Sequence, residues 1–143
     1  MRTLQRFRAL DAADRVLVVE AAAWLCGVRA GLATLPFLTL RRTLSSLSGH
    51  FAQPARQSPP HHASAPRVTW AVSAASRHLP FRTTCLIESL AAHTMLHRRG
   101  MTPELRFGVR RSPSSLAAHA WVECDGAVVA GQIDDLAEYA ALR

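Results

Sequence analysis

Apolar residues recur at helical spacing in the first third of the chain. Asp11 can cap a helix that begins at residue 12 and continues to about residue 30, because its carboxylate can accept from the free N–H groups of the first turn. A shorter helix is expected after Pro36, over residues 38–44. These helices form an N-terminal helical segment, residues 1–47, that we expect to pack on the rest of the chain.

The stretch from Val16 to Leu40 is apolar enough to raise the question of a membrane span. Gly27, Gly31 and Pro36 interrupt this stretch, which favours a buried helix over a span. We therefore expect a core helix that also contacts a partner or the surface of a membrane.

Residues 48–66 are rich in Pro, Ser, His and Ala, and this composition predicts a flexible connector. The remaining residues, 67–143, carry the patterns expected of a folded core. Their first helix, from residue 68 to about residue 78, must end before Pro80, because proline disfavours the helical conformation in the residue that precedes it.

A stronger helical pattern covers residues 85–99, with Thr84 as N-cap and Gly100 as the stop. Residues 104–110 alternate between apolar and polar residues and are predicted as a strand. Two more strands are predicted over 118–124 and 127–133. Asp125-Gly126 joins the last two and is a strong hairpin signal. The pattern predicts one α+β domain with N-terminal helices and a small antiparallel sheet.

Composition narrows the choice of partners. The 143 residues carry a formal net charge of +7, and all 17 basic residues are arginine. The arginines are scattered and not interleaved with aromatic residues, so we expect no nucleic-acid binding. The hydrophobic region that an N-terminal signal peptide needs is interrupted by Asp11, Asp14 and Glu20. We therefore expect the protein to stay in the cytoplasm.

Three cysteines without CxxC spacing are typical of a reducing compartment: Cys26, Cys85 and Cys124. His93 and His97 have the i, i+4 spacing of a metal site, but no Glu follows His93 as in a metallopeptidase motif. We interpret the two histidines as part of a solvated helix face, and we expect neither metal nor cofactor.

Cys85 stands out because it follows a polar turn at the predicted start of a helix. A thiol attacks as its thiolate, and a helix N-terminus with a nearby imidazole favours that form. His119, on the strand 118–124, is the candidate general base. Cys26 and Cys124 lie in apolar runs and are interpreted as packing residues, as is Trp121, which we expect to face away from His119.

Four segments closely resemble the lasso-peptide biosynthesis B proteins, whose C-terminal domain is a transglutaminase-like cysteine peptidase with a papain-like core. They are residues 82–91, 96–100, 105–111 and 118–126. The resemblance is weakest in the connector, and the block from His119 to Glu123 also occurs across the wider transglutaminase-like superfamily. The resemblance to the lasso-peptide B proteins implies a split form, in which the leader-recognition domain that is fused in some relatives is a separate protein.

The resemblance implies a peptidase that cleaves the leader from a lasso-peptide precursor. A separate leader-recognition protein would present the precursor, and an ATP-dependent cyclase would then close the macrolactam. The arginine pairs 98–99 and 110–111 are expected to be solvated, or to hold acidic residues of the leader. Two alternatives stay open: an acyl transferase with the same site, and a non-catalytic scaffold that docks leader and cyclase.

A residue that orients His119 is the weakest element of this prediction. Relatives carry an Asp about a dozen residues after the His, whereas Gly131-Gln132 occupies that stretch here. If Asp125-Gly126 is a two-residue turn, simple register places Gln132 opposite His119. Asp134 is the competing candidate if the strand bends or a bulge shifts the register, and an orienting residue elsewhere in the chain is the third alternative.

Overall fold

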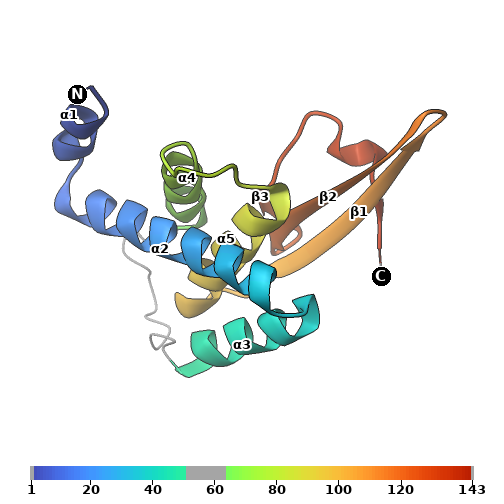
Figure 1. Cartoon of the computed structure of the whole chain (residues 1–143), viewed down its shortest axis with the longest axis horizontal. Helices are drawn as coiled ribbons and strands as arrows, with labels where there is room; N and C mark the ends of the chain where they lie inside the picture. Colours follow the sequence, from blue (N-terminus) through green and yellow to red (C-terminus); the bar gives the residue numbers. More distant parts are fainter. Residues whose placement is uncertain (1, 51–63, 143) are drawn as a thin grey trace.

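The computed structural model describes residues 2–50 and 64–142, and within them it has a helical layer and an antiparallel sheet (Figure 1). The predicted α+β class is therefore confirmed. The helices are α1 (Arg2–Ala9), α2 (Ala12–Thr34), α3 (Phe37–His50), α4 (Ala65–Ser76) and α5 (Cys85–Arg98). The strands are β1 (Glu104–Ser112), β2 (Ser115–Cys124), β3 (Ala127–Ala130) and β4 (Ala140–Ala141), with the short 3-10 helix η2 (Leu136–Glu138) before β4.

α2 begins where the sequence predicts it. The Asp11 side chain accepts a hydrogen bond of 2.7 Å from the backbone N–H of Asp14 and so caps the first turn. The helix continues to Thr34, beyond the predicted end, because Gly31 lies inside it and packs closely against the Leu40 side chain of α3. Gly31 therefore allows α2 and α3 to pack closely and does not end the helix, although the sequence had suggested that it would.

The predicted connector, residues 48–66, is shorter than expected. α3 continues to His50, and α4 already begins at Ala65. Residues 51–63 lie outside the described residues. The structure also adds α1, which the sequence analysis did not predict.

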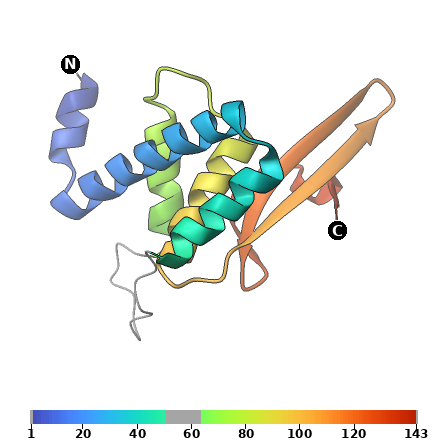
Figure 2. The same cartoon turned by 60° about the horizontal axis from the view of Figure 1, so that its bottom comes forward.

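α5 occupies the centre of the fold, where α2, α3, α4 and β2 all contact it. Ala91, Met95 and Leu96 have no exposed surface, and small residues such as Ala91 let neighbouring elements approach closely. Both general views show α2 crossing α4 and α5, with the sheet beyond them (Figures 1 and 2). The helix that begins with Cys85 is therefore enclosed by several other elements of the fold.

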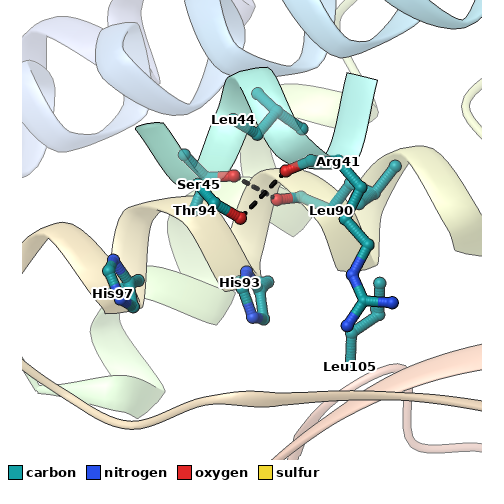
Figure 3. A pocket seen from close by; sticks show the side chains of 8 residues that line it. All are labelled: Arg41, Leu44, Ser45, Leu90, His93, Thr94, His97 and Leu105. Carbon is teal, nitrogen blue, oxygen red and sulfur yellow. Dashed lines mark hydrogen bonds between the residues drawn. The ribbon is translucent and has the colours of Figure 1, made fainter. Parts of the chain in front are cut away.

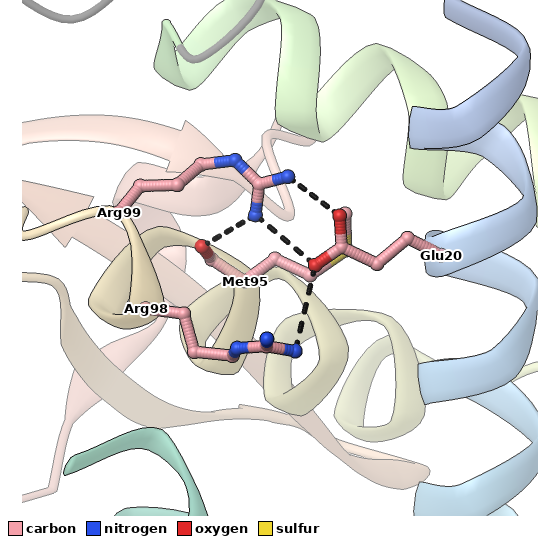
Figure 4. Close-up of polar contacts among 4 residues, drawn as sticks. All are labelled: Glu20, Met95, Arg98 and Arg99. Atoms are coloured by element: carbon pink, nitrogen blue, oxygen red, sulfur yellow. Dashed lines mark hydrogen bonds and ion pairs between the residues drawn. The ribbon is translucent and has the colours of Figure 1, made fainter. Parts of the chain in front are cut away.

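A polar cluster joins α2 to the C-terminal end of α5 (Figure 4). Glu20 accepts hydrogen bonds of 2.6 and 3.3 Å from Arg99, and Arg98 lies 3.7 Å from the same carboxylate. Arg99 also donates to the Met95 carbonyl oxygen at 2.9 Å. The expectation that these arginines are solvated or bind a leader is corrected: they pair with Glu20 inside the fold.

One face of α2 stays uncovered and apolar. Val16 and Val19 are 68% and 58% exposed. Among the described residues, only α2 is long and apolar enough to cross a membrane, and 28% of its most apolar window is buried in the fold. The exposed face has spacings of three and four and consists of Ala12, Val16, Val19, Ala23, Cys26, Ala30 and Ala33.

The sheet has the strand order β3-β2-β1-β4. Asp125 and Gly126 both have positive φ angles, 51° and 77°, as the predicted two-residue hairpin requires. The predicted register holds for the pairs Cys124–Ala127 and Glu123–Val128 and then shifts by one residue, so that Val122 pairs with Ala130. β3 ends at Ala130. On this side of β2, residues from Ala120 back toward the start of the strand therefore have no strand partner.

Candidate functional site

Cys85 is the first residue of α5, and its side chain is partly buried. Thr84 is the N-cap, as predicted, and its hydroxyl oxygen accepts from the backbone N–H of Ile87 at 3.4 Å. Thr83 donates a hydrogen bond of 2.6 Å to Glu88, one turn into the helix. Both contacts join a residue before Cys85 to a residue after it, and they fix the direction in which the chain enters the helix.

His119 lies on β2, and its ring nitrogen Nε2 is 2.7 Å from the backbone carbonyl oxygen of Gly131. A carbonyl oxygen can only accept, so Nε2 carries the proton of the neutral imidazole. Nδ1 is then the atom with a free lone pair. A backbone group thus fixes the tautomer and the orientation of the ring, as a carboxylate does in many Cys-His sites.

Gly131 can provide this carbonyl because it has no side chain. Its φ angle is +81°, and an added Cβ would lie 2.8 Å from the Ala120 carbonyl oxygen and 2.9 Å from Trp121 Cα. The chain therefore presses directly against the open edge of β2 after β3 has ended. Any other residue would combine a strained backbone with a clash against backbone atoms.

Ser89 ties α5 to the same edge. Its fully buried hydroxyl donates a hydrogen bond of 3.0 Å to the Ala120 carbonyl oxygen, which has lost its ladder partner where β3 ends. Ser89 is one helical turn after Cys85, and Ala120 follows His119. The helix start and the histidine strand are consequently held at one edge, although no hydrogen bond joins Cys85 and His119 within residues 2–50 and 64–142.

Two aromatic rings flank the imidazole. The His119 ring stacks on Trp121 at 6.3 Å between centroids and lies 5.7 Å from Tyr139. The expectation that Trp121 faces away from His119 is wrong, because residues two positions apart share a face of a strand. Trp121 is buried as predicted, but over Gly108, whose missing side chain makes room for the indole.

An ion-pair cluster holds Tyr139 in place. Arg110 lies over the Tyr139 ring at 5.4 Å, and its guanidinium pairs with Asp135 at 2.5 Å and with Glu138 at 3.0 Å. The hydrogen bond to Glu138 and the charge of Asp135 raise the pKa of Arg110. Arg110 is partly exposed, as expected of a solvated arginine, but its charge is already paired within the chain rather than free for a leader.

In the comparison with protein-family models, the model of the transglutaminase-like superfamily matches residues 22–143. The chain belongs to this superfamily. The superfamily includes cysteine-peptidase-like members, which fits a cysteine at a helix start beside a histidine strand. No curated protein and no solved structure gives a significant match.

The two side chains predicted to orient the histidine of this transglutaminase-like protein are both exposed. Gln132 donates a hydrogen bond of 3.4 Å to the Ile133 carbonyl oxygen, and the predicted pairing of Gln132 with His119 does not form because β3 ends at Ala130. Asp134 makes no hydrogen bond or ion pair with a described residue. Their catalytic roles stay predictions, while the contact with His119 is made by the Gly131 backbone.

The other two cysteines differ from each other. Cys124 is partly buried against the core, and burial, followed by the charge of Asp125, raises the pKa of its thiol, as suits a packing residue. Cys26 is exposed on α2, contrary to its interpretation as a packing residue. Any thiol chemistry on this transglutaminase-like protein therefore has to control for Cys26.

Sequence reasoning missed three residues of this transglutaminase-like site. Gly131 contributes a main-chain atom, which no side-chain motif reveals, although a glycine just after a strand is a signal of close backbone approach. Ser89 and Tyr139 reach the histidine strand from distant parts of the sequence. Their positions beside the strand of His119 depend on the tertiary fold and cannot be inferred from neighbouring residues.

Proposed function

We propose that this chain is a cysteine peptidase that removes the leader from a lasso-peptide precursor, before a separate ATP-dependent cyclase closes the macrolactam. The proposal rests above all on the hydrogen bond between His119 Nε2 and the Gly131 carbonyl. It leaves Nδ1 as the proton acceptor on a strand that Ser89 links to the helix of Cys85. The resemblance of the segments around Cys85 and His119 to lasso-peptide B proteins supplies the substrate class.

In this mechanism the Cys85 sulfur attacks the scissile carbonyl carbon, and Nδ1 of His119 takes the thiol proton. The backbone N–H of Cys85, at the free end of α5, can donate to the developing oxyanion. When the C–N bond breaks, the imidazolium returns its proton to the leaving amine. Water then attacks the thioester, which releases the leader as a carboxylic acid and restores the thiol.

In this proposal, the hydrogen bond between Cys85 and His119 forms when the substrate binds. Hydrogen bonds of catalytic groups are often long or poorly aligned in free enzymes and tighten in the substrate complex. The Gly131 carbonyl can remain bound while the imidazole adjusts about this single hydrogen bond. The missing carboxylate predicts a slower enzyme than one whose imidazolium is stabilised by a full negative charge.

The partners implied are the precursor, a separate leader-recognition protein and the cyclase. The exposed apolar face of α2 supports docking of another protein, and it also fits association with a membrane surface. The proposed location remains the cytoplasm. Sedimentation with lipid vesicles, with and without the leader-recognition protein, separates the two uses of α2.

The decisive experiment mixes the protein with precursor and leader-recognition protein in water enriched in oxygen-18, and reads the products by mass spectrometry. Peptidase activity gives two fragments, with the heavy isotope in the new carboxyl group of the leader. Cys85→Ala and His119→Ala should abolish both fragments, whereas Cys26→Ser, an exposed thiol, serves as the matched control and should retain activity.

The same experiment distinguishes the alternatives. An acyl transferase would yield a leader joined to an added amine, without heavy oxygen in the leader. A scaffold is favoured by one observation: the His119 imidazole contacts a carbonyl rather than a carboxylate. If Cys85→Ala still supports formation of the mature product, the scaffold replaces the peptidase.

A further inference from the structure

A pocket of about 220 Å³ lies between α3, α5 and the start of β1, away from Cys85. His93 is eight residues after Cys85, which corresponds to about 12 Å along the helix. Figure 3 shows His93, His97 and the Arg41 side chain on one side of this space. The α3–α5 pocket is lined by Arg41, Leu44, Ser45, Leu90, His93, Thr94, His97 and Leu105.

The polar lining can become cationic and contains no carboxylate. Arg41 has no ion pair within the described part of the chain, whereas Arg99 and Arg110 each bind a carboxylate. Burial lowers the pKa of His93, and the nearby His97 and Arg41 lower it further. Arg41 is thus a cation that lines the pocket without a carboxylate beside it, and this suits an anionic ligand.

His97 adds an independent observation. It lines the same pocket, and its Nδ1 atom is buried without a hydrogen-bond partner among the described residues, which is costly for a polar atom. The rings of His93 and His97 stack in parallel, 6.3 Å apart. No group of three or more His, Cys, Asp or Glu residues that could hold a metal occurs in the described chain, so a metal would lack ligands here.

The rest of the lining defines the shape of the ligand. Leu44, Leu90 and Leu105 offer apolar surface that a small inorganic anion would not use. The hydroxyls of Ser45 and Thr94 already donate to carbonyls of their own helices, at 2.9 and 2.8 Å, so they can only accept. They therefore suit an N–H group of the ligand rather than its anionic end.

We propose that the α3–α5 pocket binds an acidic side chain of a peptide. Arg41 and the two histidines bind its carboxylate, the leucines cover its methylene groups, and the hydroxyls accept from its backbone N–H. His93 and His97 are both partly buried, so the interpretation of them as a solvated helix face is wrong. It does not depend on Cys85 being a nucleophile, so binding here and cleavage at Cys85 can fail separately.

NMR of the histidine rings in the full chain tests the proposal, with N-acetylglutamate amide as the probe and N-acetylglutamine amide as its neutral isostere. The glutamate probe should shift the His93 and His97 resonances and raise the pKa of His93. The glutamine probe should bind at least about tenfold more weakly, because it lacks the charge-assisted bonds. Equal shifts from the two probes overturn the proposal.

Arg41→Gln should weaken the glutamate probe by about tenfold, since one charged donor is lost. Arg42→Gln is the matched control: Arg42 is exposed and adjacent in α3 but does not line the pocket, so it should leave binding unchanged. Inorganic phosphate at the same ionic strength tests the apolar requirement. Shifts from phosphate as large as those from the glutamate probe, or an Arg41→Gln variant that binds normally, would refute the assignment.

Discussion

The Nε2 atom of His119 lies 2.7 Å from the carbonyl oxygen of Gly131. This places a main-chain atom where Cys-His enzymes commonly use a side chain. The contact depends on a glycine that has a positive φ angle and lies against the backbone of β2. The orientation of the candidate base is therefore linked to the way in which β3 ends.

Replacing Gly131 by Ala should impair both stability and activity. The residue has a φ angle of +81°, and a Cβ would meet the Ala120 carbonyl oxygen at 2.8 Å. We expect a loss of roughly 1–2 kcal/mol from the backbone conformation alone and a fall in kcat/KM of roughly tenfold to a hundredfold from the displaced imidazole. Urea unfolding and precursor cleavage measure the two effects.

Gly126→Ala is the matched control for this change. Gly126 has a similar φ angle of +77°, but no atom lies within 4 Å of an added Cβ. This variant should lose stability through backbone strain and keep its kcat/KM. If both glycine variants lose activity equally, the Gly131 carbonyl is not what orients His119.

Substitution of the two side chains first predicted to orient His119 gives a complementary test. Gln132 and Asp134 are exposed, and neither is bonded to the imidazole. Gln132→Ala and Asp134→Ala should each leave kcat/KM almost unchanged. A tenfold loss, equivalent to about 1.4 kcal/mol, in one variant and not in the other would identify that residue as the orienting group.

Ser89→Ala should reduce stability more than its size suggests. The change deprives the buried Ala120 carbonyl of its donor, and an unsatisfied buried acceptor costs ~1–3 kcal/mol. Thr94→Val is the control, because this equally buried hydroxyl donates only to the Leu90 carbonyl of its own helix. Similar losses in the free energy of unfolding for the two variants would contradict a special role for the α5–β2 link.

Glu20→Gln tests the polar link between α2 and α5. The Glu20 and Arg99 side chains are only 24% and 16% exposed, so their charged hydrogen bonds should contribute ~2 kcal/mol. Glu104→Gln removes a carboxylate that pairs with Arg106 but is 64% exposed, and it should cost less than about 1 kcal/mol. Urea unfolding of both variants compares the two ion pairs, and equal losses would show that burial adds nothing to the α2–α5 contact.

Features encoded by neighbouring residues could be predicted from the sequence. The cap at Asp11, the helix start at Thr84-Cys85 and the turn at Asp125-Gly126 depend on side chains and backbone preferences within a few positions. The structure confirms all three. They also locate Cys85 and His119 on a helix start and a strand before any long-range contact is known.

Contacts made across the fold could not be predicted in the same way. The one-residue shift near Val122 separates Gln132 from His119 and brings the Gly131 carbonyl to the imidazole instead. Tyr139 lies beside His119 although it is distant in the sequence, and Arg110 lies over its ring. A bulge and a tertiary ion pair depend on packing, which periodicity in the sequence does not encode.

Stability should depend on pH through His93. Burial, then His97 and Arg41, lower the pKa of His93 in the folded protein, and a hydrogen bond to the Pro103 carbonyl only partly opposes them. The unfolded chain, with an ordinary histidine pKa of about 6.5, therefore binds more protons than the folded chain as the pH falls below that value.

The free energy of unfolding should consequently decrease as the pH falls through about 6.5 toward the lower folded pKa. His93→Gln removes this contribution and should flatten the profile over that range, whereas His78→Gln, at an exposed histidine in the loop before α5, should follow the wild type. Urea unfolding at a series of pH values measures the three profiles. Parallel curves for His93→Gln and wild type would show that protonation of His93 is not coupled to folding, because its imidazole would then bind protons equally in both states.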